Sequence, residues 1–412
     1  MSTNNKPRVA ILHFAAPPII GGVESTIADH ARLFADHGYS VKIIAGRGEQ
    51  SDPRVPVQII PTIDSKHPLV AMVNEGLTGG QVPPEFNALV SSLTQALSDA
   101  LQDVDVVIAH NVPTLHKNLA LTAALHELAQ PNRPRLIAWC HDFAWTDPVY
   151  ASELHSGLPW ELTRTRWPNT SYVVVSKARR TELAELFHLN EEEIAVVPPG
   201  LDVNAFFGLT DMTLRWDRNF NLLDGAPLFL LPARVTRRKN IELAIEITAA
   251  LRELGHAAKT VVMGPLGPHN ATNVDYFNVL CALRHERGVD DAVIFLHEYG
   301  TVSDLERRDL YALADALLFP SEREGFGIPI LEAGLARLPI FCADIPPFRE
   351  SAGERANYFA LDEPPRTIAA RIADFFEHDS RYQLKQHVLR EYAWERIFSE
   401  RMEPLLSSIP PS

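Results

Sequence analysis

Cysteine is scarce in this chain, and its three cysteines, Cys140, Cys281 and Cys342, lie far apart and each within an apolar run. An odd number of widely spaced cysteines provides no disulfide framework, so we expect buried thiols in a reducing compartment. The spacing of cysteine and histidine that is typical of zinc sites is also absent. These absences exclude the small disulfide-rich and zinc-dependent classes of protein.

Long hydrophobic runs are missing as well. No stretch approaches the roughly 20 apolar residues that a helix needs to span a bilayer. The segment Met1 to Arg8 is polar and lacks the apolar core and small-residue cleavage site of a signal peptide. We therefore expect a cytoplasmic protein without a transmembrane segment.

Positive charge is in deficit: 38 Lys and Arg face 52 Asp and Glu, which gives a formal net charge of −14. Sequence-independent binding to nucleic acid needs Lys and Arg against phosphate, so this balance argues against nucleic acid as a partner. It also argues against general attraction to anionic lipid. The glycine fingerprint G-x-G-x-x-G is absent too, which disfavours an NAD-dependent dehydrogenase.

What the chain does contain is a repeated alternation of short buried strands and helices over 412 residues, a length that favours two domains. The first βαβ unit, with parallel strands, consists of the run 8–14, the pair Gly21-Gly22, a helical pattern over 23–37 and the run 41–45. Further strands are expected at 104–109, 136–139, 172–175 and 194–197, and then at 228–231, 259–263, 293–296, 316–319 and 340–342. We expect helices at 118–128, 241–254, 276–287, 304–314, 328–337 and within 368–406.

The pattern predicts an α/β protein with two consecutive doubly wound domains. Residues 206–224 are expected to be irregular, and the domain boundary is placed near Phe206.

The richest motif is FPSEREGFGIPILEAGLARLPI, residues 319–340. A strand ends before Pro320, and a helix is expected to open near Pro329, because proline suits the first turn of a helix. Two carboxylates, Glu324 and Glu332, stand on the loop and on the helix, where both can face one cleft and bind sugar hydroxyls. The glycines of the loop let the backbone approach a ligand, and the helix N-terminus offers free N–H groups to an oxygen-rich or anionic group.

A second motif, LPARVTRRKN at residues 231–240, follows the first strand of the second domain. Ligands of open α/β sheets bind outside the carboxyl ends of the strands, and Arg234 and Lys239 lie there. An Arg and a Lys at that edge suit a diphosphate. Arg237 and Arg238 are interpreted as a solvated basic loop.

The first domain contributes weaker candidates. His141, with Asp142, follows the strand at 136–139, and Gly21-Gly22 stand at the first strand-to-helix turn. His13 and the pair His110-Asn111 also lie at strand ends and are secondary pocket candidates.

The spacing Glu324-x7-Glu332 resembles the E-x7-E motif of family 4 retaining glycosyltransferases, which have the GT-B fold. Shorter stretches, VVPPGLDVNAF (196–206), VVMGPLG (261–267) and EYAWERI (391–397), resemble the family in the same order along nearly the whole chain. The resemblance implies an acceptor-side Rossmann-like domain over 1–205 and a nucleotide-sugar-binding domain over 206–392, facing each other across a cleft. A C-terminal helix at about 393–412 would cross back to the first domain.

On the donor side, the resemblance implies that Glu332 holds the ribose hydroxyls and that Glu324 faces the hexose near its anomeric carbon. The backbone N–H groups of Gly325, Phe326 and Gly327 would line the sugar pocket.

The remaining roles concern charge and the reacting centre. Arg234 and Lys239 would stabilise the leaving nucleoside diphosphate, and the N–H groups at Gly21 and Gly22 would meet the donor phosphate. His141 would orient the hexose. Ala233 stands where the family often has glycine, a small departure because alanine is small.

The function expected from this resemblance is transfer of a hexose, with retention, from a donor of the UDP-glucose or GDP-mannose type to a hydroxyl acceptor. That acceptor is a small metabolite, a glycan or a lipid head group. The donor is a co-substrate, and no further cofactor is expected. Asp103-Val104-Asp105 matches the D-x-D metal motif of another glycosyltransferase fold, but it opens a buried strand, so we predict no catalytic metal.

Two alternatives stay open. A sugar-nucleotide epimerase of the same fold would change the sugar isomer without an acceptor. A non-catalytic nucleotide-sugar-binding protein would show no transfer or donor hydrolysis above background.

Overall fold

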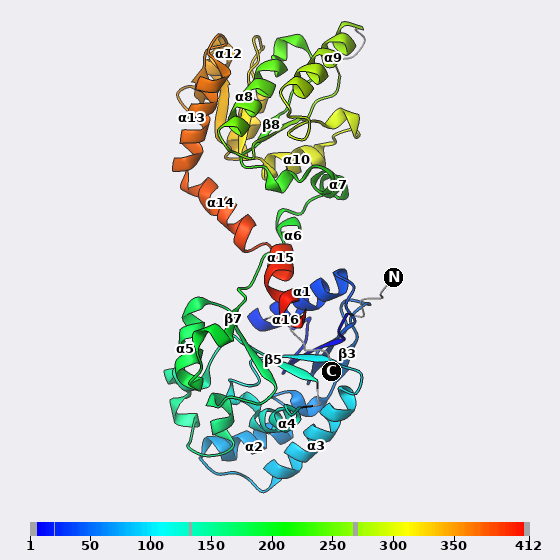
Figure 1. Ribbon diagram of the computed structural model, residues 1–412, viewed down its shortest axis with the longest axis vertical. Helices are drawn as coiled ribbons and strands as arrows, with labels where there is room; N and C mark the ends of the chain where they lie inside the picture. The colour runs from blue at the N-terminus through cyan, green and yellow to red at the C-terminus, as the bar shows by residue number, and fades with distance from the viewer. Residues whose placement is uncertain (1–5, 20, 132–133, 267–270, 408–412) are drawn as a thin grey trace. The chain divides into compact units, whose positions relative to one another are not determined.

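A computed structural model describes residues 6–19, 21–131, 134–266 and 271–407 of the chain. The chain divides into two compact units, one made of Met1–Gly200 with Trp394–Ser412 and the other of Leu201–Ala393 (Figure 1). The chain passes from the first unit to the second after Gly200, a few residues before Phe206, where the sequence predicts the boundary. The segment from Trp394 onward belongs to the first unit, and residues 408–412 of the expected terminal helix lie outside the described residues.

The first unit is built on a parallel sheet of seven described strands in the order β3-β2-β1-β4-β5-β6-β7. Its strands are β1 Val9–His13, β2 Val41–Ala45, β3 Val57–Ile59, β4 Val106–His110, β5 Arg135–Cys140, β6 Thr170–Val174 and β7 Ile194–Val196. Every residue of β1 and β4 is buried, as expected of parallel strands covered on both faces.

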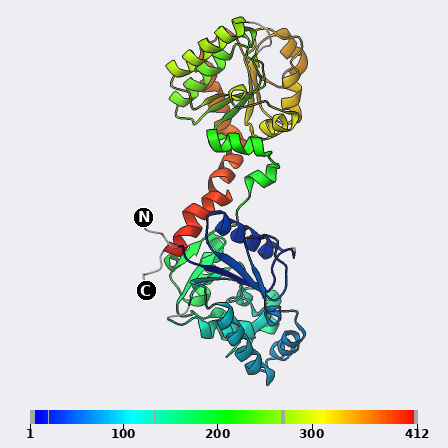
Figure 2. The same ribbon diagram turned by 90° about the vertical axis from the view of Figure 1, so that its right-hand side faces the viewer.

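Helices cover both faces of this sheet (Figure 2). On one face, α1 and the C-terminal segment pack on alternate residues of the central strands, and on the other face α2, α3 and α4 do so. The helices are α1 Gly22–Asp36, α2 Pro68–Thr78, α3 Glu85–Ala100, α4 Leu119–Leu128, α5 Lys177–Phe187, α15 Trp394–Ile397 and α16 Glu403–Ser407, with a π-helical turn at Phe398–Met402. Short 3₁₀ turns are η1 Pro61–Ile63, η2 His116–Asn118, η3 Ala144–Thr146, η4 Pro148–Glu153, η5 Trp160–Arg164 and η6 Glu191–Glu193.

The second unit repeats the plan with six described strands in the order β10-β9-β8-β11-β12-β13. Its strands are β8 Leu228–Leu231, β9 Lys259–Val262, β10 Val293–Phe295, β11 Ala316–Phe319, β12 Ile340–Ala343 and β13 Asn357–Phe359. Its helices are α6 Val203–Phe207, α7 Asp211–Phe220, α8 Ile241–Glu253, α9 Ala271–Glu286, α10 Asp304–Leu313, α11 Ile328–Leu335, α12 Pro346–Ala352, α13 Pro365–His378 and α14 Ser380–Glu391, with 3₁₀ turns η7 Leu222–Asp224, η8 Arg237–Lys239 and η9 Leu296–Glu298. The prediction of two doubly wound α/β domains of the GT-B type is confirmed.

The expectation of irregular structure over 206–224 is wrong, because α7 occupies most of that segment. Thr210 caps the helix by accepting a hydrogen bond from the backbone N–H of Thr213 at 3.3 Å. Asp309 on α10 accepts the N–H of Thr210 at 2.7 Å, and Trp216 is buried in the core of the unit. Met212, Trp216 and Phe220 recur at intervals of four residues and pack on the core of the unit, so the helix has a narrow apolar stripe that the prediction overlooked.

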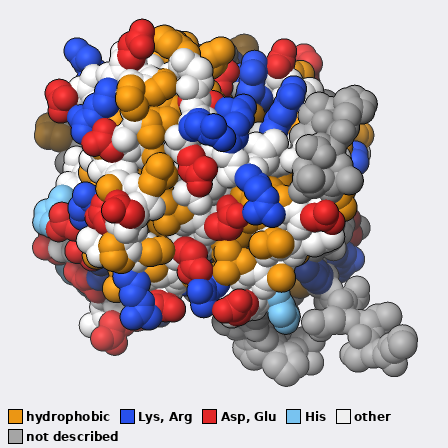
Figure 3. Space-filling view, turned by 90° about the horizontal axis from the view of Figure 1, so that it is seen from above, with side chains coloured by type: hydrophobic (Ala, Val, Ile, Leu, Met, Phe, Trp, Pro, Cys, Tyr) orange, Lys and Arg blue, Asp and Glu red, His pale blue; other side chains and the backbone are white. Residues whose placement is uncertain are grey.

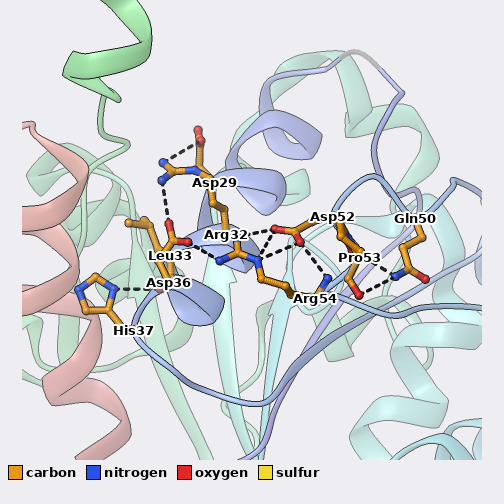
Figure 4. Close-up of polar contacts among 9 residues, drawn as sticks. All are labelled: Asp29, Arg32, Leu33, Asp36, His37, Gln50, Asp52, Pro53 and Arg54. Atoms are coloured by element: carbon orange, nitrogen blue, oxygen red, sulfur yellow. Dashed lines mark hydrogen bonds and ion pairs between the residues drawn. The ribbon is translucent and has the colours of Figure 1, made fainter. Parts of the chain in front are cut away.

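A surface network fixes the end of α1 against the loop that follows β2 (Figure 4). Arg54 donates to Asp36 at 2.7 Å and to Asp52 at 2.7 Å, while Arg32 reaches Asp36 at 3.1 Å. Acidic and basic side chains are similarly interspersed over the face seen in Figure 3. Pairs this exposed contribute little each, so the buried sheet carries most of the stability.

Candidate active site

The candidate residues gather at the switch point of each sheet, where the order of the strands reverses. In the first unit that point lies between β1 and β4, and in the second between β8 and β11. Ligands of doubly wound sheets bind in the crevice outside the carboxyl ends of the strands at such a point. The segments that follow these four strands hold the predicted site residues except His141, which follows the neighbouring strand β5.

In the second unit, the loop after β8 lines an open cavity of about 390 Å³. Its lining residues are Pro232, Ala233, Arg234, Thr236, Arg238, Lys239 and Asn273. The predicted pair Arg234 and Lys239 therefore shares one cavity with a third cation, Arg238. Arg238 is about half exposed, as expected of a solvated basic loop, and it also lines this cavity.

Lys239 forms an ion pair with Glu324, which stands on the loop after β11. Both side chains are about one-tenth exposed, and Arg238 reaches the same carboxylate at 3.2 Å from a half-exposed position. Burial lowers the pKa of Lys239, while Glu324 acts to raise it, and Arg238 and Arg234 add to the lowering. With three cations against one carboxylate, the cavity keeps an excess of positive charge.

The loop from Glu324 to Gly327 leads into α11. Gly327 has a φ of 95°, and a Cβ at this position would lie 3.0 Å from the Phe348 ring, so both conformation and space favour glycine. Among the described residues, the backbone N–H groups of Gly325, Phe326 and Gly327 have no hydrogen-bond acceptor. Free N–H groups at the start of a helix are suited to an oxygen-rich ligand.

Glu332 is the fifth of the eight residues of α11 and has partners different from those of Glu324. The hydroxyl of Tyr311 on α10 donates to Glu332 Oε2 at 2.7 Å, and Arg307 reaches Oε1 at 3.4 Å. The side chain of Glu332 keeps 28% of its surface exposed, so the carboxylate is oriented and still accessible. The two carboxylates of the motif therefore have separate partners: Glu324 contacts Lys239 and Arg238, and Glu332 contacts Tyr311 and Arg307.

Gly264 brings the loop after β9 against the loop that carries the cations. A Cβ on Gly264 would overlap the carbonyl of Ala233 and lie 2.6 Å from the N atom of Arg234. The two loops also pair through Val235 and Leu266. Glycine is therefore needed for the position of Arg234, while Gly267 of the same motif lies outside the described residues.

In the first unit, His141 is held by the residues that end β4. Nε2 of His141 and Nδ1 of His110 lie 3.0 Å apart, so one of the two nitrogens donates a proton to the other. Asn111, at a φ of 59°, accepts the backbone N–H groups of His141 at 2.7 Å and of Asp142 at 3.2 Å. Burial lowers the pKa of His141 to about 4, so its imidazole is neutral near pH 7.

Two more histidines surround this pair. Nδ1 of His13 donates to the backbone carbonyl of His110 at 2.9 Å, and the ring of His30 on α1 lies 5.3 Å from the ring of His110. Burial lowers the pKa of both His13 and His110, and it lowers that of His30 to about 3. The sequence directed attention to His13 and His110, while His30 lies within a helical pattern and gave no signal.

Gly21 and Gly22 stand at the start of α1, where Gly21 is the N-cap residue. A Cβ on Gly21 would overlap the carboxylate of Glu24, whereas one on Gly22 would meet no described atom within 4 Å. The first turn of α1 therefore holds an acidic side chain close to its free N–H groups.

The carboxylates of the D-x-D match lie at the amino end of β4, the edge opposite to the candidate residues. Asp103 pairs with Lys42 at 2.6 Å, and Asp105 pairs with Arg8 at 3.0 Å. Hydrogen bonds from these partners lower the pKa of both carboxyls. Within the described ranges, no group of three or more His, Cys, Asp or Glu side chains has the arrangement of a metal site. Over the same ranges, no helix is both long enough and apolar enough to cross a membrane.

Comparison with known proteins assigns each half of the chain to a glycosyltransferase family. The family described as Glycosyltransferase Family 4 matches residues 20–205, and that described as Glycosyl transferases group 1 matches residues 214–396. Mannosylglucosylglycerate synthase from Petrotoga mobilis is 27% identical over 309 residues, which cover 66% of this chain and 69% of that protein.

Two further relatives differ in how much of them is matched. D-inositol 3-phosphate glycosyltransferase from Stackebrandtia nassauensis is 24% identical over 82% of this chain and 76% of its own length. Serotype-specific mannosyltransferase WbdA from Escherichia coli is 31% identical over 54% of this chain, and the match spans only 25% of that protein.

Proposed function

The chain belongs to family 4 of the glycosyltransferases, and on that premise we propose that it transfers a hexose from a nucleoside-diphosphate sugar to a hydroxyl acceptor with retention of configuration. The observation that carries the proposal is the cavity after β8, which Arg234, Arg238 and Lys239 line and where Arg238 and Lys239 pair with Glu324. An excess of positive charge there suits a leaving diphosphate.

The cations supply the main catalytic contribution. As the bond between the anomeric carbon and the phosphate oxygen breaks, negative charge grows on the diphosphate. Charges that are already in place at that point stabilise the transition state without reorganisation. Lys239 is held in place by its ion pair with Glu324, and the close packing at Gly264 fixes the backbone that carries Arg234.

The remaining groups orient the donor and the acceptor. Glu332, fixed by Tyr311, binds the ribose hydroxyls, and Glu324 and the neutral His141 hold the hexose. The N–H groups at 325–327 line the sugar, and those at Gly21 and Gly22 meet the donor phosphate. The donor phosphate oxygen takes the proton of the attacking hydroxyl on the same face of the sugar, which retains the configuration.

The donor is tested first by thermal unfolding with UDP, GDP and ADP in parallel. A nucleotide at about 100 times its dissociation constant adds roughly 2.7 kcal/mol to the stability of the folded state. A mannose-containing donor is the first sugar to test, because two of the relatives described above are named for mannose. No stabilisation by any nucleotide would contradict the proposal.

Arg234→Ala tests the phosphate site, with Arg252→Ala on α8 as a matched control that removes an arginine outside the cavity. We expect the first variant, and not the second, to lose turnover at least a hundredfold, a typical effect of removing one group that stabilises developing charge. The anomeric proton of the product in an NMR spectrum reports retention. Activity should persist in EDTA, and loss of activity that manganese or magnesium restores would contradict the prediction of no catalytic metal.

A further inference from the structure

A second cavity, of about 150 Å³, lies in the first unit. Its polar lining comes from helices and turns that follow the carboxyl ends of β3, β4 and β5: α2, η2, η4 and η5. The cavity is therefore at the same edge of the sheet as His110 and His141, and none of its lining residues has a role in the site described above. The side chains used below are His116, Lys117, Glu153 and Trp160.

Two buried polar atoms of this wall lack a hydrogen-bond partner among the described residues: Nε1 of Trp160 and Nδ1 of His116. Trp160 is 3% exposed and His116 is 8% exposed. A buried polar group without a partner costs about 1–3 kcal/mol. A ligand that offers an oxygen to the indole N–H and a hydroxyl to the imidazole would recover that energy.

The hydrogen-bonding character of each group follows from its neighbours. Nε2 of His116 lies 2.7 Å from Oε2 of Glu153 and donates to it, because a carboxylate only accepts. Burial lowers the pKa of His116, so its Nδ1 is a bare acceptor near pH 7. The indole nitrogen of Trp160 only donates, while Lys117, whose ammonium lies 4.2 Å from the Tyr150 ring centre, supplies a further donor.

Short backbone connections tie the cavity to His141. The segment 111–116 connects the two places. At its start, Asn111 accepts the backbone N–H of His141, and at its end His116 lines the cavity. In its middle, the carbonyl of Thr114 accepts the N–H of Ala144 at 2.9 Å, which joins the loop after β4 to the loop after β5. A ligand in the cavity would thus lie on the scaffold that also holds His141.

We propose that this cavity binds the acceptor and that the acceptor is a small polyhydroxylated compound, a free sugar or a polyol. The wall presents hydrogen-bond donors and acceptors side by side, which suits hydroxyl groups because a hydroxyl both donates and accepts. The positive charge of Lys117 is balanced by the negative charge of Glu153, so the lining has no excess charge that would select an ionic ligand. The inference rests on the proposed glycosyl transfer, and it specifies the substrate class that the transfer uses.

The test measures steady-state transfer from the sugar donors of the nucleotide that stabilises the protein to glycerol, glucose, mannose and myo-inositol. We expect at least one of them to accept the hexose. In Trp160→Phe, which removes the indole N–H together with part of the ring system, and in Glu153→Ala, the KM for that acceptor should rise about tenfold, the equivalent of 1.4 kcal/mol. The KM for the donor should stay the same, and Glu153→Gln should recover part of the loss.

Glu127→Gln on α4 is the matched control, because Glu127 accepts from Thr94 and does not line the cavity. It should leave both KM values unchanged. The proposal is overturned if no compound in the panel is accepted, or if the acceptor KM is the same in Trp160→Phe and Glu153→Ala as in the original chain. A nucleotide-stabilised protein that accepts none of the panel would refute only this inference, whereas a protein that no nucleotide stabilises would refute the proposed function.

Discussion

His30→Phe is the substitution that tests most directly how the first unit holds its neutral histidines. His30 is 1% exposed on α1, and its ring lies 4.6 Å from Trp139 and 5.3 Å from Trp394, both edge-on. Burial lowers its pKa from the ordinary 6.5 to about 3. Phenylalanine fills similar space and cannot take up a proton.

The sign and size of the effect follow from proton linkage. The pKa of His30 is depressed in the folded state, so its contribution to stability is fully present above pH 6.5 and is lost as the pH falls toward 3. Between those values the unfolded chain binds one more proton at this site, which costs about 1.4 kcal/mol per pH unit. At pH 5 the free energy of unfolding should therefore have fallen by about 2 kcal/mol through His30 alone.

Urea unfolding followed by tryptophan fluorescence measures this loss. Five of the six tryptophans lie in the first unit, so the signal reports mainly that unit. The difference in unfolding free energy between His30→Phe and the original chain should shift by about 2 kcal/mol in favour of the variant from pH 7.5 to pH 5. His188→Asn removes an exposed histidine of the same unit and should leave the pH dependence unchanged. A difference that stays constant across pH would refute the reasoning.

Three other predictions concern the second unit. Lys239→Met leaves the Glu324 carboxylate buried beside only a half-exposed arginine, so the free energy of unfolding measured by calorimetry should fall by about 3 kcal/mol. The double variant Lys239→Met/Glu324→Gln should recover part of this loss, and equal stability of the single and double variants would contradict the prediction. Gly264→Ala should displace the loop that carries Arg234 and weaken nucleotide binding about tenfold by titration calorimetry, whereas an unchanged affinity would show that the loops do not depend on each other. Glu332→Gln should reduce the preference for UDP or GDP over its 2′,3′-dideoxy analogue; an equal preference would exclude the ribose as its ligand.

Much of the fold could be predicted from the sequence because buried parallel strands are continuous apolar runs with little ambiguity. The run at 41–45 and that at 228–231 have the same bounds in the structure as in the prediction. The short edge strands β3 and β13 were missed, since three residues with partly exposed side chains leave no clear pattern. Helix α7 was missed although Met212, Trp216 and Phe220 have helical spacing, because polar residues make up most of the segment.

The candidate site was predictable to the extent that its residues stand at strand ends with characteristic chemistry. The contact between Lys239 and Glu324 joins two motifs that are 85 residues apart, and the sequence places each motif without showing that they meet. The contact of Arg238 with Glu324 was not predicted for the same reason, because the fold supplies that partner. Tyr311 gave no signal, since a tyrosine within a helical pattern resembles any core aromatic residue.

The two units handle charge in opposite ways, and the proposed chemistry accounts for the difference. The second unit places Arg234, Arg238 and Lys239 beside an open cavity and pairs Arg238 and Lys239 with Glu324, an arrangement that suits a diphosphate ligand. The first unit buries His110 and His141 so that both are neutral, with one nitrogen donating to the other. A neutral imidazole can donate to or accept from a hydroxyl without attracting the diphosphate, so charge would direct the phosphate to the second unit and leave His141 to the sugar. This division of roles requires the affinity for nucleotide to be insensitive to His141→Gln while turnover falls.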